Sequence, residues 1–150
     1  MLRDTIVGKD GVLKQVNGVL FYYDIARGKW ISVFREVFSF THDHRNIVAD
    51  MWLRIEGKIP SNINGYLMSR DSVITALSAK TENISDCIFH IRKNGSPTDI
   101  TSLTFNNQTT GSINSLNIDL NAGDYIQCFL EVISGNVDYP VVNIEVAARI

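Results

Sequence analysis

The sequence predicts an all-β protein: an antiparallel β-sandwich or jelly roll at residues 35–150, preceded by a small N-terminal β-meander at residues 1–34. Short runs of β-branched and aromatic residues recur at regular spacing, and turn residues separate them. No stretch shows convincing helical periodicity. A parallel sheet, whose crossover connections need helices, is therefore not expected.

The meander has the clearest local signals. Residues 12–16 and 19–24 are rich in β-formers and flank Asn17-Gly18. Asn-Gly favours a two-residue type I′ turn, because both central residues of that turn need a positive φ. Residues 26–29 form a second turn, and residues 30–34 are the expected third strand.

The remaining strands are expected where apolar runs alternate with polar residues. They fall at residues 36–41, 51–56, 66–68, 72–81, 87–93, 102–105, 113–120, 125–133 and 141–150. The run 72–81 could also place Val73, Ile74 and Leu77 on one face of a helix, but its length and its Ser, Thr and β-branched content favour a strand. Polar loops are expected at residues 41–46, 59–65, 106–112 and 134–140.

The last strand is predicted to lie inside a sheet. Alternate positions from Val142 to Ala148 are apolar. An exposed edge with this pattern would promote aggregation.

Length and charge exclude several classes of protein. The 150 residues suit one hydrophobic core. The formal net charge is -2 with scattered basic residues, so nucleic-acid binding is not expected. No apolar run has the length of a signal peptide or of a membrane span, so we expect synthesis in a cytoplasm, a mature chain that starts at Met1 and no membrane insertion.

The two cysteines lie in apolar, strand-like runs. We expect Cys87 and Cys128 to be reduced core thiols, and a disulfide between neighbouring strands remains an open alternative.

No catalytic motif is recognised, so no enzyme activity, metal or cofactor is expected. His42-Asp43-His44 has the ligand types of a metal site, but no motif marks a further ligand, and a solvated loop is the favoured interpretation. His90 is expected to be a half-exposed strand histidine.

Two groups of residues are candidates for binding, because aromatic residues and arginine are enriched at interfaces. The first group either packs on the main domain or contacts a neighbouring subunit or scaffold, and comprises Tyr22, Tyr23, Arg27 and Trp30. The second group is expected near loops that face a ligand, and comprises Trp52 and Tyr66.

Several stretches resemble a group of tailed-bacteriophage virion proteins. Those proteins join a short meander with the pattern DG…YDxxRxKWLSV to a C-terminal jelly roll, and the broader likeness is to trimeric heads of the C1q and tumour-necrosis-factor type. The matching stretches are residues 3–12, 19–33, 89–95, 118–128 and 139–142. Residues 24–33 are the most distinctive part, and residues 41–70 match least well.

The resemblance implies a non-enzymatic structural protein located in the virion after synthesis in the host cytoplasm. It would be a homotrimer that contacts other capsid or tail proteins, as a head fibre or decoration protein attached through the meander. The alternative is the knob of a tail fibre that binds a host glycan or protein receptor. Trimerisation would bury apolar strand faces. Three copies in one particle would also combine individually weak contacts to a cell surface into a stronger attachment. A small depolymerase is disfavoured, because no convergent carboxylates are found.

Overall fold

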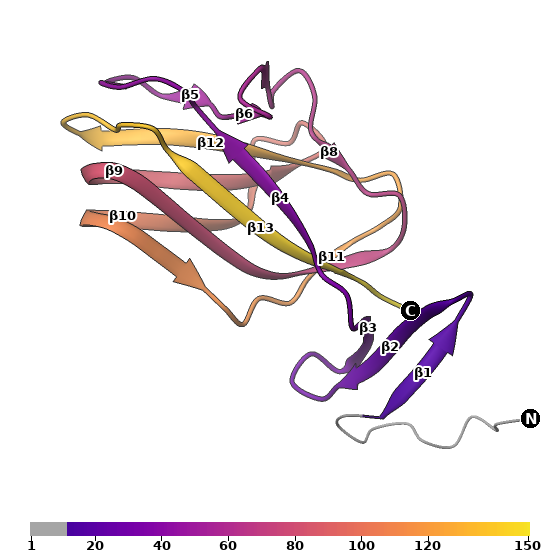
Figure 1. The fold of residues 1–150 in the computed structure, drawn as a ribbon. Helices are drawn as coiled ribbons and strands as arrows, with labels where there is room; N and C mark the ends of the chain where they lie inside the picture. The colour runs from indigo at the N-terminus through magenta and orange to yellow at the C-terminus, as the bar shows by residue number, and fades with distance from the viewer. Residues whose placement is uncertain (1–11) are drawn as a thin grey trace, which may run out of the picture.

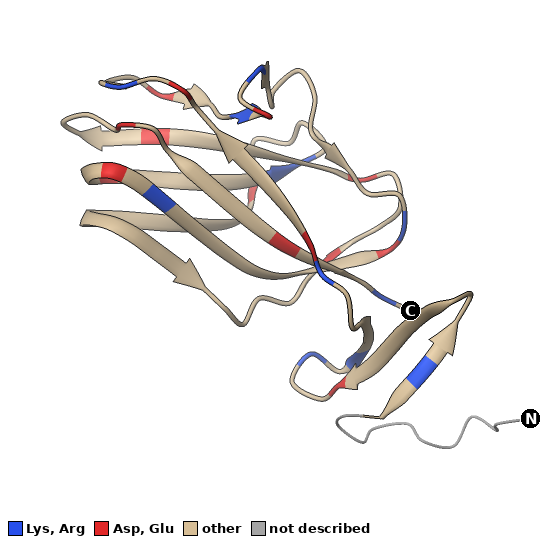
Figure 2. Cartoon of the chain, in the orientation of Figure 1, with Lys and Arg blue, Asp and Glu red and all other residues tan. Residues whose placement is uncertain are grey.

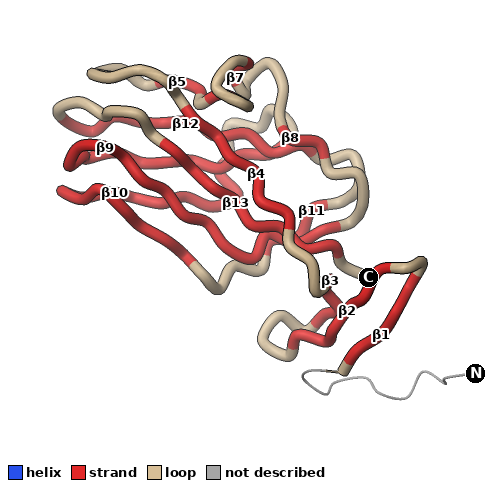
Figure 3. The backbone as a smooth tube through the Cα atoms, in the orientation of Figure 1, coloured by secondary structure: helices blue, strands red, loops and turns tan. Residues whose placement is uncertain are grey.

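The computed structural model describes residues 12–150 and contains only strands as regular elements in that range (Figures 1 and 3). The first eight strands are β1 (Leu13–Val16), β2 (Val19–Asp24), β3 (Lys29–Ser32), β4 (Glu36–Thr41), β5 (Met51–Trp52), β6 (Arg54–Ile55), β7 (Ile59–Pro60) and β8 (Tyr66–Leu67). The others are β9 (Ser72–Lys93), β10 (Asp99–Ile113), β11 (Ile118–Leu120), β12 (Tyr125–Ser134) and β13 (Val141–Ala148). The prediction of an all-β fold is confirmed.

The meander forms a sheet of its own, in the order β1-β2-β3, at one end of the molecule (Figure 1). Its first turn has φ values of 49° at Asn17 and 81° at Gly18, as the type I′ prediction requires. The predicted division of the chain at residue 34 falls between β3 and β4.

The other strands build two antiparallel layers that share β9. The first half of β9 pairs with β13, which pairs with β4 and through it with β6 and β7. The second half of β9 pairs with β12, whose other edge holds β5 and β8. Strand β13 therefore lies between β4 and β9, and its predicted central position is confirmed.

The continuity of β9 corrects the sequence-based boundaries. Two strands were expected at residues 72–81 and 87–93, but one strand spans both, and the polar stretch between them stays in the ladder. Thr81 and Ser85 are buried in this stretch, and both hydroxyls donate to the carbonyl oxygen of Asn83. These bonds satisfy the polar groups where β9 passes from one layer to the other.

The loop expected at residues 106–112 is also wrong, because these residues belong to β10. Strand β10 pairs with β9 along its length, with register shifts around Gln108 and a positive φ of 52° at Asn107. Its other edge carries no strand in the described part of the chain. An exposed edge suits the polar side chains that favoured a loop in the sequence.

A third correction concerns residues 51–56, which form two short strands instead of one. Leu53 lies between them and is fully buried. Its N–H donates to the Cys128 carbonyl of β12, and its own carbonyl accepts from the backbone N–H of Ser61. The chain thus crosses at Leu53 from the layer of β12 to the layer of β4.

The core lies between the two layers and follows the alternation of the strands. One central contact is the edge-to-face pair of Phe89 and Phe105, with ring centroids 5.1 Å apart. The largest fully buried side chains include Phe40, Leu77, Phe89, Ile91, Phe105, Leu130 and Ile144.

Cys87 and Cys128 are both buried and free. Desolvation raises the pKa of the Cys87 thiol to about 12 and raises the pKa of Cys128 as well. The expectation of reduced core thiols is confirmed. Among residues 12–150, no helix is long and apolar enough to cross a membrane.

Candidate binding surface

Tyr22 and Arg27 of the meander pack on the sandwich. The Tyr22 ring lies against a small buried cluster of Ile31, Val73 and Ala147. Its hydroxyl accepts a hydrogen bond of 2.7 Å from Arg35. Of the two alternatives that the sequence left open, packing on the main domain describes these two residues.

Arg27 forms the joint between the meander and the sandwich. Its Nη1 atom lies 2.6 Å from Asp24 Oδ2, its Nε donates to the Leu116 carbonyl at 2.7 Å, and its Nη2 donates to the Thr75 carbonyl at 3.3 Å. Burial alone would raise the pKa of Asp24, but the bonds and charge of Arg27 lower it overall. An ion pair between Lys29 and Asp119 of 2.5 Å adds to the joint.

Tyr23 and Trp30 form an aromatic pair on the meander. They lie opposite each other in the register of β2 and β3, with ring centroids 5.5 Å apart in an edge-to-face arrangement. The Lys14 ammonium group lies 5.5 Å from the centre of the Trp30 ring. Both aromatic rings are partly exposed, so this pair is available for contact with another protein.

Trp52 belongs to a second surface, on the outer face of the layer of β12. It lies in β5, within the strand expected at residues 51–56, and directly opposite Phe129 of β12, at 5.2 Å between ring centroids. The Arg92 guanidinium of β9 lies 4.7 Å from the Phe129 ring centre and 5.5 Å from that of Trp52. We name the residues Trp52, His90, Arg92, Asp99, Phe129 and Glu131 the outer-face cluster.

His90 links the charged members of the outer-face cluster. Its Nδ1 lies 2.5 Å from Asp99 Oδ2 and its Nε2 lies 2.8 Å from Glu131 Oε2. Arg92 Nε donates to the other oxygen of Asp99 at 3.0 Å. Burial alone would raise the pKa of Asp99, but hydrogen bonds from His90 and Arg92 lower it overall.

Sequence reasoning named Trp52 but missed its neighbours in the cluster. The alternation of side chains along β9 and β12 could have indicated them. Ile91 and Leu130 point into the core, and because neighbouring residues of a strand point to opposite faces, His90 and Phe129 point outward. The sequence does not reveal which outward residues of separate strands become neighbours, because that depends on strand order.

Tyr66 lies in β8, within the strand expected at residues 66–68. Its ring packs on Phe38 and Phe40, at 4.8 and 5.1 Å between centroids. Its hydroxyl donates to the Ser39 carbonyl at 2.8 Å, and desolvation raises its pKa. These contacts give Tyr66 a structural role at the end of the core.

The solvated loop expected at His42-Asp43-His44 is only partly correct. Asp43 and His44 are exposed, but His42 is buried, with 5% of its surface accessible. Desolvation lowers the pKa of His42, and the nearby charge of Arg54 acts in the same direction.

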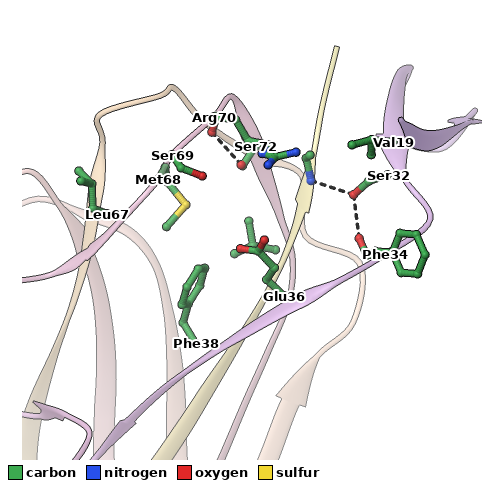
Figure 4. Close-up of a pocket in the computed structure, with 12 residues that line it drawn as sticks. Val19, Ser32, Phe34, Glu36, Phe38, Leu67, Met68, Ser69, Arg70 and Ser72 are labelled. Atoms are coloured by element: carbon green, nitrogen blue, oxygen red, sulfur yellow. Dashed lines mark hydrogen bonds between the residues drawn. The ribbon is translucent and has the colours of Figure 1, made fainter. Parts of the chain in front are cut away.

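An open cleft of about 150 Å³ lies between the meander and the sandwich (Figure 4). Phe34 and Leu67 are its most exposed apolar walls, with 74% and 66% of their surfaces accessible. Glu36 and Arg70 are the charged residues in its lining. A cleft of this size is smaller than the roughly 300–1,000 Å³ of pockets for small-molecule ligands, and it suits a single apolar side chain.

Charged residues of both signs are spread along the strands and loops of the described chain (Figure 2). The outer-face cluster combines two aromatic rings with one guanidinium, one imidazole and two carboxylates. Such a surface can bind a partner by stacking and by hydrogen bonds, and it has no strong excess of either charge.

Comparison with protein-family models and with curated proteins finds no match. Among solved structures, one described as "CBM4 structure and function" is similar, with 10% sequence identity and a TM-score of 0.30. The match covers 95% of this chain and 80% of that chain. We draw no functional conclusion from a likeness at this level.

Proposed function

We propose that this chain is a non-enzymatic structural protein of a tailed-phage virion, displayed on the particle as a trimeric head fibre or decoration protein. One observation supports it above the others. The stretch with the most distinctive resemblance, residues 24–33, contains three charged residues that take part in the contacts between the meander and the sandwich. These are Asp24, Arg27 and Lys29. Tyr23 and Trp30 of the same stretch remain partly exposed and available for attachment.

The exposed apolar side chains support assembly into an oligomer. Phe34 and Leu67 line the cleft between the meander and the sandwich, and Val37 on β4 is 60% exposed. A symmetric oligomer would cover such residues, because subunit contacts bury apolar surface.

The test of attachment uses the full chain with Tyr23→Ala and Trp30→Ala together. Particles that lack the protein are incubated with purified protein, and bound protein is measured after sedimentation. We expect the wild type to sediment with the particles and the double variant to lose most of its binding. The matched control is Leu13→Ala, an exposed β1 residue outside the aromatic pair. Equal binding of the wild type and the double variant would refute attachment through this pair.

The test of assembly is the molar mass in solution across a dilution series. We expect a stable mass of about three chains, as for a closed symmetric oligomer. A monomer at every concentration would remove the trimer from the proposal.

The outer-face cluster favours a second candidate function, the binding of a neutral saccharide by a tail-fibre knob. The C–H face of a sugar ring can pack on an aromatic ring, whose face carries partial negative charge. Trp52 and Phe129 supply adjacent rings, and Asp99, Glu131 and Arg92 supply hydrogen-bonding groups around them.

This candidate is tested by titrating the full chain with neutral oligosaccharides from host surfaces and following Trp fluorescence and heat. Trp52→Ala should weaken binding by at least about tenfold, because aromatic anchors dominate such interfaces. Trp30→Ala is the matched control, since Trp30 is the other tryptophan and lies on the meander. If both variants bind like the wild type, the outer-face cluster is not the saccharide site.

A further inference from the structure

His42, Asp43 and His44 bring three potential metal ligands to one point at the end of β4. The strand ends at Thr41, so the next three residues leave the alternation of an extended strand. His42 Nδ1 and His44 Nε2 lie 3.8 and 3.7 Å from the same oxygen, Asp43 Oδ1. One ligand atom from each of the three residues lies within 4.8 Å of the others.

His42 gives an independent indication of a ligand. Its side chain is only 4% exposed, and Nδ1 has no hydrogen-bond partner in the described part of the chain. A buried polar atom without a partner is unfavourable, because it has lost its hydrogen bonds to water and gained none in the protein. A metal ion bound to this nitrogen would replace the missing hydrogen bond.

The backbone holds the two histidines in place. The N–H of His42 donates to the Pro140 carbonyl at 3.1 Å, and the carbonyl of His44 accepts from Tyr139 at 3.0 Å. Both bonds connect the segment to the loop before β13. The ligands therefore lie on a fixed segment, which lowers the entropy lost when an ion binds.

We propose that His42, Asp43 and His44 form a binding site for a divalent transition-metal ion such as Zn²⁺. Bonds of about 2.0–2.1 Å in a tetrahedral site place neighbouring ligand atoms roughly 3.4 Å apart, so the observed separations need only small side-chain shifts. Three protein ligands leave one position for water or for a group from a binding partner.

Arg54 is the charged group that opposes this site. Its Nη1 atom lies 3.8 Å from Asp43 Oδ1, the oxygen between the two histidines. Its positive charge repels a cation, and its ion pair with Asp43 competes for the ligand oxygen. Removing this charge should therefore strengthen metal binding.

The test is calorimetric titration of tag-free full-length protein with ZnCl₂, together with the visible absorption of Co²⁺ bound in its place. We expect one ion per chain and Co²⁺ bands typical of a four-coordinate site. His44→Ala should weaken binding by at least about tenfold, as expected when a metal site loses a supporting group. Arg54→Gln should tighten it.

His90→Ala is the matched control, because the chain has three histidines and His90 lies in the outer-face cluster. It should bind Zn²⁺ as the wild type does. His44 is exposed, so circular dichroism should show that its variant keeps the fold. Absence of binding to the wild type, or equal binding by the wild type and His44→Ala, would overturn the site.

Discussion

The Nε atom of Arg27 donates to the carbonyl oxygen of Leu116 at 2.7 Å, although 89 positions separate the two residues. The same guanidinium pairs with Asp24 and reaches the Thr75 carbonyl. One side chain thus joins the β2–β3 turn, the start of β9 and the segment before β11. This joint fixes the meander relative to the sandwich.

Replacing Arg27 by Met should therefore destabilise the whole chain. The substitution leaves the Asp24 carboxylate, which is 7% exposed, without its cation. Removing one partner of a mostly buried ion pair lowers the free energy of unfolding by about 2–4 kcal/mol. Urea unfolding should show this loss. Arg45→Met is the matched control, because the pair of Arg45 with Glu82 is exposed and its loss should leave stability almost unchanged. Equal effects of the two variants would contradict the structural role of Arg27.

Asp24 should also make the protein sensitive to acid. The pKa of Asp24 is lowered in the folded state, so its contribution is fully present above the usual value of 3.8. That contribution is lost as the pH falls through the lowered folded value, because protonation removes the pairing with Arg27. Asp24→Asn should give a flatter dependence of the unfolding free energy on pH below about pH 4. A variant curve with the same slope as the wild type would contradict this assignment.

Local features of the sequence predicted local structure well. Asn17-Gly18 forms the expected turn, and β4 spans Glu36–Thr41 as predicted. These elements depend on backbone preferences and alternation, which neighbouring residues determine.

Features that depend on the partner strand were missed. The polar residues between Thr81 and Ser85 indicated a break, but side-chain hydrogen bonds keep them inside β9. Trp52 and Phe129 meet only because β5 pairs with β12, and no local pattern determines that pairing. The sequence therefore indicated single outward-facing residues of the candidate site, but not which of them lie next to one another.

Gly65 is expected to tolerate no side chain. A Cβ atom there would lie 2.5 Å from the Ile126 carbonyl oxygen and 2.7 Å from the Tyr125 ring. Because Ile126 belongs to β12, its backbone cannot move without disturbing the pairing with β8. Gly65→Ala should cost about 1–3 kcal/mol of unfolding free energy in urea. The exposed neighbour Asn64 provides the control, since Asn64→Ala should be close to neutral.

Cys87 and Cys128 should be protected from thiol reagents in the folded protein. Both are fully buried, and desolvation raises the pKa of Cys87 to about 12. The thiolate is the reactive form, so only a minute fraction can react near neutral pH. Ellman's reagent should therefore detect almost no thiol in the native chain and two thiols after denaturation without reductant.

An Asn114→Cys variant is the positive control for the thiol assay, because Asn114 is exposed in the segment between β10 and β11. Its new thiol should react at once while the two native thiols stay protected. Rapid labelling of the wild type would mean that the core opens easily. No thiols after denaturation would mean that Cys87 and Cys128 are joined by a disulfide, contrary to the free thiols of the structure. The two results are distinct, so the assay separates an unstable core from a wrong cysteine assignment.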